Sequence, residues 1–124
     1  MTDMAIIKAD GEESVLKLHS NSATGMVYQR IFNRNFYNDV DSIRNAQENP
    51  AIVQEIFPRV FYTWNLMYQC GNGLTIADIL KKTEMDYIEW LMQYSLNAFI
   101  STEAVSAFAE EYSKGTETKS DAKN

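Results

Sequence analysis

The residues best suited to chemistry in this sequence are few and lie far apart. The chain has a single histidine, His19, and a single cysteine, Cys70. Nucleophilic catalysis needs a nucleophile held beside a base, and the base must itself be oriented by a third group. The residues around His19 and Cys70 form no motif of that kind. We therefore interpret His19 as a polar residue at a strand end and Cys70 as a small buried residue at a helix end.

Carboxylates are more numerous, and they form three clusters: Glu12 with Glu13, Glu84 with Asp86 and Glu89, and Glu110 with Glu111. Hydrolysis by paired carboxylates needs two of them facing each other across a cleft. In these clusters the carboxylates are adjacent or share one helix surface, so solvated faces and helix starts explain them. The glycines form no phosphate-binding pattern. We expect no catalytic residue, no metal site and no cofactor, and we interpret the chain as a non-enzyme.

Composition narrows the class of protein further. The chain has 124 residues, which is one domain's worth, and 45% of them are hydrophobic, which is enough to build a core. Its net charge of -6 and its pI near 4.7 argue against binding to nucleic acid or to an anionic membrane surface. One cysteine allows no intrachain disulfide, and no apolar run approaches the roughly 20 residues of a membrane helix. We expect a cytoplasmic protein.

The hydrophobic pattern predicts an α+β fold that is mainly α, in one globular domain over residues 1–113. Residues 4–19 predict a β-hairpin that turns at Asp10-Gly11. Residues 22–113 predict about five helices, and the longest of these begins at Pro50 and ends at Gly71 to Gly73. The hairpin is expected to pack on these helices, since two strands alone are marginal in water. Residues 114–124 lack an apolar anchor and predict a disordered polar tail.

Local signals refine the helix boundaries. The first helical pattern frays in the asparagine-rich stretch Asn33 to Asn38, and residues 41–47 are expected to add a turn or two of helix. Two segments, Thr75–Asp78 and Thr83–Asp86, resemble capping boxes with aspartate in place of the usual glutamate. The helix after the second box is expected to present one apolar side, comprising Tyr87, Ile88, Leu91, Met92 and Ser95.

Two helical stretches hold more large apolar side chains than one helix face can bury. One runs from Phe57 to Tyr68 and the other from Tyr87 to Tyr94. Core packing explains much of both, but an excess of this kind also marks a partner or oligomer contact. Methionines at positions 67, 85 and 92 suit an adaptable binding surface. The candidate partner-binding residues are Phe61, Tyr62, Trp64, Met67, Tyr68, Trp90, Met92 and Tyr94.

In their order along the chain, these elements resemble the tail assembly chaperones of long-tailed, siphovirus-type bacteriophages of Gram-positive hosts. The resemblance covers residues 4–112 and is one of pattern, with no catalytic signature. Asn33 to Asn49 is longer and richer in asparagine than the family's pattern. Besides the hairpin, the segments that match are Asn21–Phe32, Ile56–Met67, Asp78–Leu80 and Ile88–Met92.

The resemblance implies a role. Such a chaperone binds and solubilises the tape measure protein in the host cytoplasm during tail assembly, and it is absent from the mature virion. A frameshifted longer form is common in the family. The resemblance further implies many copies along one client, so that weak contacts suffice through multivalency, and it favours a homo-oligomer.

Three other functions stay open at this point. The first is a small acidic helical adaptor or regulator that binds one folded protein partner. The second is an enzyme with an unrecognised acidic site at Asp78, Asp86 and Glu89. The third, DNA binding, is disfavoured by charge and would need one basic patch, made of Lys8, Lys17, Arg30, Arg34 and Arg44.

Overall fold

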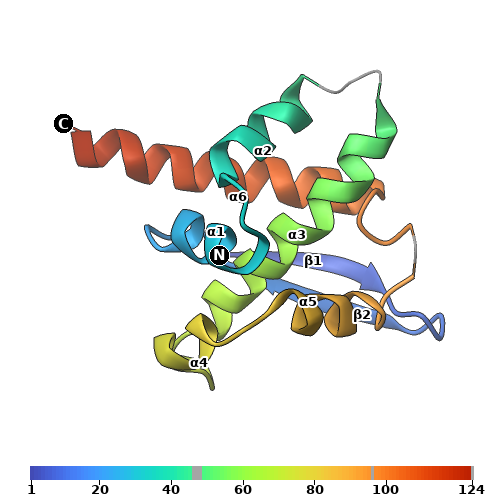
Figure 1. Ribbon diagram of the computed structural model, residues 1–124. Helices are drawn as coiled ribbons and strands as arrows, with labels where there is room; N and C mark the ends of the chain where they lie inside the picture. Colours follow the sequence, from blue (N-terminus) through green and yellow to red (C-terminus); the bar gives the residue numbers. More distant parts are fainter. Residues whose placement is uncertain (46–48, 96, 124) are drawn as a thin grey trace.

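The computed structural model describes residues 1–45, 49–95 and 97–123, with side chains described as far as residue 114. Within these residues a two-stranded antiparallel sheet is followed by six helices (Figure 1). The predicted class, α+β and mainly α, is confirmed. The elements are β1 (Thr2–Ile7), β2 (Glu13–Leu18), α1 (Thr24–Phe32), α2 (Phe36–Arg44), α3 (Pro50–Gln69), α4 (Ile76–Leu80), α5 (Glu84–Leu91) and α6 (Thr102–Lys123).

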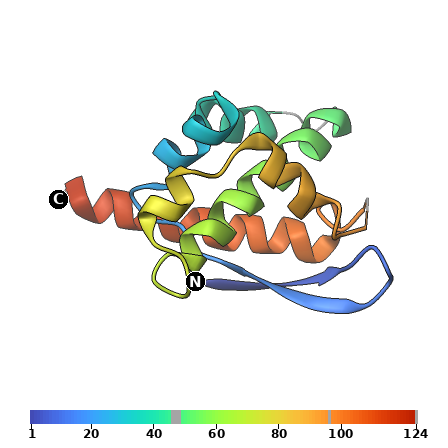
Figure 2. The ribbon, with the colours of Figure 1, turned by 60° about the horizontal axis from the view of Figure 1, so that its bottom comes forward.

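The hairpin turns where the sequence predicts. Gly11 has φ of 88°, a conformation that glycine adopts without strain. The register pairs Thr2 with Leu18 and Ile7 with Glu13, so β1 begins two residues before the predicted position 4. Alternate residues of β1 are buried, beginning with Thr2. This face packs against the helices, with β1 along α6 and β2 along α3 (Figure 2).

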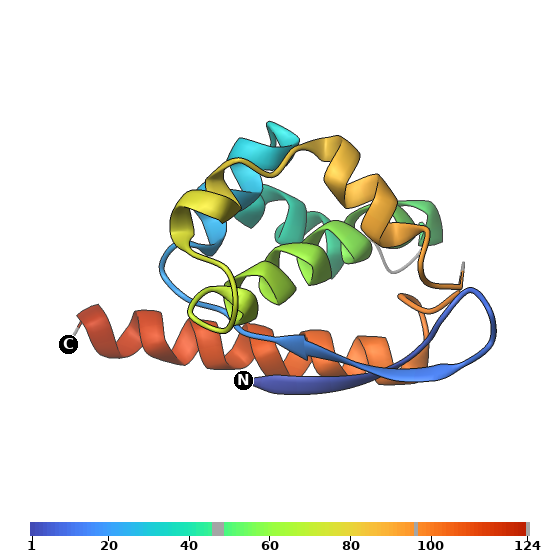
Figure 3. The ribbon, with the colours of Figure 1, turned by 90° about the horizontal axis from the view of Figure 1, so that it is seen from below.

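Helix α3 is the centre of the molecule. Figure 3 shows it between two layers, with α6 and the hairpin on one side and α1, α4 and α5 on the other. Helix α2 also packs against it. Every residue from Val60 to Met67 is buried, so the helix is covered on all of its sides there. A helix that is apolar all round belongs in this position.

The asparagine-rich stretch ends one helix and starts the next. Asn33 adopts a left-handed conformation, with φ of 54°, and ends α1. Asn35 caps α2, because its side chain accepts a 2.9 Å hydrogen bond from the backbone N–H of Asn38. The expectation that helix resumes only at residue 41 is therefore wrong, since α2 begins at Phe36. Residues 46 and 47, also expected to be helical, lie outside the described residues.

Both predicted capping boxes are confirmed. In each, the threonine hydroxyl accepts from a backbone N–H three residues on, and the aspartate there accepts from the threonine N–H at 2.8 Å. The backbone hydrogen bond from Thr83, followed by its side-chain bond, lowers the pKa of Asp86 below its usual value. The hydrogen bonds from Thr75 lower the pKa of Asp78 in the same way. These boxes fix the starts of α4 and α5.

Replacing Thr83 with alanine should lower the free energy of unfolding by about 1 kcal/mol, because the first turn of α5 loses its capping oxygen. Urea unfolding followed by circular dichroism measures the change. Thr83→Ser keeps the hydroxyl and serves as the matched control. Equal losses in the two variants would show that the methyl group, and not the cap, stabilises this turn.

The C-terminal region of the described chain is a single long helix, α6. Helix α6 begins at Thr102 and continues to Lys123. The side chains of residues 115–123, and residue 124 as a whole, lie outside the described residues. The predicted disordered tail at 114–124 therefore stays a prediction. Lys114 itself contacts the start of β1, because its ammonium donates to the carbonyl of Met1 at 2.8 Å.

Candidate functional site

Four of the eight candidate partner-binding residues lie in the core. Phe61, Tyr62, Trp64 and Met67 on α3 are all buried. Their assignment to a binding surface is therefore corrected, since a buried side chain cannot contact a partner of the folded protein. The physical reason is the position of α3, which neighbouring elements cover on every side. The excess of apolar residues on this helix marks a central element and not an exposed patch.

Three further candidates are half-buried, and two of them, Trp90 and Tyr94, pack among aromatic rings. The ring of Trp90 lies 5.1 Å from that of Tyr62 and 5.4 Å from that of Phe99. The ring of Tyr94 lies 5.6 Å from that of Phe99. Tyr68, near the end of α3, is also half-buried. Trp90 and Tyr94 anchor α5 and the segment after it to the core, which leaves little of their surface for a partner.

The last candidate, Met92, is the C-cap residue of α5 and continues an exposed apolar stripe of that helix. Its side chain is 72% exposed, Met85 is 61% exposed and Ile88 is 41% exposed. These residues are three and four positions apart, which places them on one side of a helix. At about 100° per residue, the three span only about 60° of the helix surface. We call Met85, Ile88 and Met92 the α5 stripe.

The opposite side of α5 faces the core. The ring of Tyr87 lies 4.9 Å from that of Phe32 on α1 and 5.4 Å from that of Tyr62 on α3. The one apolar side expected for this helix is therefore divided in the structure, since Tyr87 is buried whereas Ile88 and Met92 are exposed. Large apolar residues occur on more than one side of this helix, so its hydrophobic pattern leaves the orientation open. Contacts of Tyr87 and Trp90 with other aromatic rings determine which side is buried.

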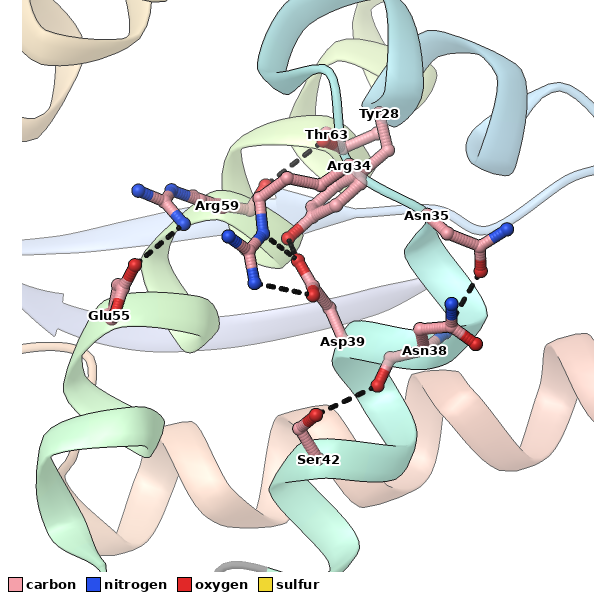
Figure 4. Close-up of polar contacts among 9 residues, drawn as sticks. All are labelled: Tyr28, Arg34, Asn35, Asn38, Asp39, Ser42, Glu55, Arg59 and Thr63. Carbon is pink, nitrogen blue, oxygen red and sulfur yellow. Dashed lines mark hydrogen bonds and ion pairs between the residues drawn. The ribbon is translucent and has the colours of Figure 1, made fainter.

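A buried carboxylate links α1 and α2. Asp39 accepts hydrogen bonds from Arg34 at 2.7 and 2.9 Å, in a bidentate pair, and from the hydroxyl of Tyr28 (Figure 4). Burial alone would raise the pKa of Asp39, but the bonds from Arg34 and Tyr28 outweigh it and lower that pKa below its usual value. Burial and the bond to Asp39 raise the pKa of Tyr28. These groups satisfy one another, which indicates a structural role.

Arg59 of α3 lies close to this cluster (Figure 4). Its guanidinium forms an ion pair with Glu55 at 3.2 Å and lies 5.7 Å from the centre of the Phe32 ring. The Thr63 hydroxyl donates to the Arg59 carbonyl at 2.9 Å, so the buried hydroxyl of Thr63 has its partner within the helix. The cluster thus joins α1, α2 and α3 at one place. It is a polar junction between packed helices and not an open site.

A second buried carboxylate joins α6 to the N-terminal region. Ser20 donates its backbone N–H at 2.8 Å and its hydroxyl at 2.7 Å to Glu111. The N-terminal ammonium lies 3.7 Å from the other carboxylate oxygen. Burial would raise the pKa of Glu111, but the bonds from Ser20 and Thr2 and the nearby ammonium lower it. The interpretation of Glu111 as part of a solvated face is therefore wrong.

The two residues that could act as nucleophile or base are far less organised. His19 is half-buried, and its Nδ1 atom has no hydrogen-bond partner among the described residues. Cys70 is also half-buried, at the end of α3, and packs against the core, as the sequence suggests in part. In the part of the chain that the structure describes, no three His, Cys, Asp or Glu side chains could hold a metal ion.

An open groove of about 640 Å³ lies between the hairpin and the segment before α6. The hairpin contributes Ala5, Ile7 and Val15, and the other wall includes Ser95 and Asn97. Its charged lining within the described residues consists of Glu13 and Glu103, and both are exposed. Exposed like charges on a groove of small side chains do not form an acid–base pair across a cleft.

Compared with known proteins, the chain matches no family model, no curated protein and no solved structure. Among the described helices, none has both the length and the apolar character needed to cross a membrane. The α5 stripe is the most concentrated group of exposed large apolar side chains on a single described helix.

Proposed function

We propose that this protein is a non-enzymatic tail assembly chaperone, which binds and solubilises a tape measure protein in the host cytoplasm during tail assembly. It would be absent from the finished virion. Two lines of reasoning support the proposal. The order of the hairpin and helices, together with the segments in them, resembles that family. The α5 stripe supplies an apolar surface that a folded protein could offer to an aggregation-prone client.

The α5 stripe is the observation on which the proposal depends. Two of its three side chains are methionines, which are flexible and polarisable and so adapt to different apolar partners. The helix beneath them is held by a capping box at its start and by Tyr87 and Trp90 on its inner side. A client could therefore bind without any unfolding of the chaperone.

The stripe is small, and this fits a chaperone that acts in many copies. Three side chains on one helix make a modest contact, so a single copy would bind weakly. Many copies along one long helical client would add their contacts through multivalency. No nucleotide, metal or other cofactor is needed for such binding, because covering apolar surface is favourable by itself.

Co-expression with the large helical tape measure protein tests the proposal. The client should become soluble and co-purify with several copies of this chain. The double variant Met85→Ser/Met92→Ser should lower the soluble client at least about fivefold, because it removes most of the exposed apolar area of the stripe. Soluble client is measured by quantitative gel analysis after centrifugation.

The matched control is Val15→Ser/Val105→Ser, which removes two side chains that are 55% and 51% exposed on the hairpin and on α6. This variant should keep the client soluble. Equal loss with both variants would remove the α5 stripe from the proposal. A complex with one copy of this chain per partner would instead favour the acidic adaptor.

A further inference from the structure

Two glutamates border the α5 stripe, one along each edge. Glu84 and Glu89 are both exposed. On a helix of about 100° per residue, Glu84 lies about 40° beyond Ile88, and Glu89 lies about 40° beyond Met85 on the other edge. The stripe therefore presents an apolar centre with a negative charge on each side. The whole chain reinforces that sign, with a net charge of -6.

We infer that the partner segment bound by α5 is an amphipathic α-helix whose apolar face is bordered by lysine or arginine. The inference depends on the proposed function, because it names the part of the client that the α5 stripe contacts. Charge complementarity is its basis. A basic residue beside each edge of the client's apolar face would lie opposite Glu84 or Glu89.

The dimensions of the stripe favour a helix as the partner element. From Met85 to Met92 is seven residues, or about 10 Å along the helix axis, which is two turns. A client helix with apolar residues at i, i+3 or i+4, and i+7 presents a face of the same length and width. Two helices packed in this way interdigitate their side chains at both ends of the stripe.

A second copy of this chain fits the α5 stripe less well. Pairing two stripes would place the glutamates of one copy close to the same glutamates of the other, and like charges across a contact oppose association. The negative charge of the whole chain adds to this repulsion at long range. Nucleic acid and anionic membranes are opposed by the same charges. The stripe is thus better suited to a basic partner than to a homo-oligomer contact.

The test uses the full chain and two synthetic helical peptides of about 20 residues, long enough to be partly helical alone. Both peptides carry the same leucine stripe. Lysine borders the stripe in one peptide and glutamate borders it in the other. Fluorescence anisotropy measures the dissociation constants. We expect the lysine peptide to bind about five- to tenfold more tightly at low salt, and the difference to shrink as salt screens the charges.

Glu84→Gln/Glu89→Gln should reduce the preference for the lysine peptide severalfold while the chain stays folded. The matched control is Glu12→Gln/Glu103→Gln, which removes the same charge from exposed positions and also changes one glutamate in the first turn of a helix. The control should keep most of the preference, because only the charges beside the α5 stripe contact the peptide. Met85→Ser/Met92→Ser should abolish binding of both peptides.

Equal affinity for the two peptides would overturn the inference. An equal loss of preference in the two glutamine variants would also overturn it, because the preference would then arise from the net charge of the chain and not from Glu84 and Glu89. A client that co-purifies normally with Glu84→Gln/Glu89→Gln would overturn the charge inference and leave the chaperone function standing. Selective binding of the lysine peptide, with no effect on tape measure solubility, would support this partner chemistry and count against the chaperone function.

Discussion

Replacement of Trp64 by alanine should destabilise the fold by about 3–5 kcal/mol, the range measured for loss of a large buried aromatic side chain. Trp64 is 1% exposed at the centre of α3. Its ring lies 5.5 Å from Phe108 of α6 and 6.5 Å from Phe36 of α2. Its removal therefore opens a cavity where α6 and α2 meet the central helix.

Urea unfolding at fixed temperature measures this loss, with circular dichroism as the signal. Met92→Ala is the control, because Met92 is exposed and its loss should change stability by no more than about 0.5 kcal/mol. A small domain has only about 5–15 kcal/mol of stability in total, so Trp64→Ala should also unfold at a much lower temperature. A melting temperature that barely moves would show that the packing of α6 and α2 on α3 does not depend on this ring.

Structural features that depend only on residues close together in the sequence could be predicted. The hairpin turn needs only Gly11 and its positive φ, and each capping box needs a threonine and an aspartate three residues apart. These signals work at short range, so no knowledge of the rest of the fold is required. The same is true of Pro50 at the first turn of α3, where its missing N–H has no cost.

The α5 stripe could not be predicted in full, because the exposure of a helix face depends on which distant elements pack against it. A local sequence pattern does not contain that information. Helix α3 and helix α5 both have excess apolar residues, yet α3 is covered on all sides and α5 on one side only. The difference follows from the number of layers around each helix. Among the eight candidate residues, only Met92 lies on the α5 stripe. Met85, singled out as a suitable methionine, and Ile88, placed on the apolar side of the same helix, complete it.

The buried carboxylates escaped prediction for a related reason. Glu111 is held by Ser20, which is 91 positions away in the sequence, so no spacing rule connects them. Asp39 is closer to its partners, but nothing local distinguishes it from the exposed Asp41 on the same helix. A carboxylate is buried where the fold supplies donors for it, and these donors become neighbours only after the helices pack.

Asp39→Ala should therefore cost about 2–4 kcal/mol of unfolding free energy. Tyr28 is fully buried, and the variant leaves its hydroxyl without the acceptor that it has in the native chain. The side chain of Arg34 is partly exposed, so its charge can be solvated, and this keeps the cost below that of a wholly buried pair. Asp41→Ala is the matched control and should change stability little.

A double-mutant cycle with Tyr28→Phe separates these contributions. In the native chain, Tyr28→Phe removes a hydrogen bond to a charged acceptor and should cost about 1.5–3 kcal/mol. In the Asp39→Ala background the same change removes a hydroxyl that has already lost its acceptor, so the cost should nearly vanish or reverse sign. Equal costs in the two backgrounds would show that Tyr28 and Asp39 are not coupled.

The two buried carboxylates, Asp39 and Glu111, predict how stability depends on pH. The pKa of Asp39 is lower in the folded state than in the unfolded chain, and so is that of Glu111. At acidic pH the unfolded chain thus binds more protons than the folded one, and stability rises with pH there. The stabilisation is complete above the ordinary carboxyl pKa of about 4 and is lost as pH falls below it.

Asp39→Asn/Glu111→Gln should consequently lose less stability than the native chain as pH falls through this acidic range, with the capping aspartates Asp78 and Asp86 keeping the remaining dependence. Urea midpoints measured between about pH 2 and pH 6 give the two slopes. Asp41→Asn, which changes an exposed carboxyl, should keep the native slope. A native slope in the double variant would assign the acid sensitivity to other carboxylates. The expected flattening would show that these two buried groups connect the protonation of the protein to the packing of α2 and α6.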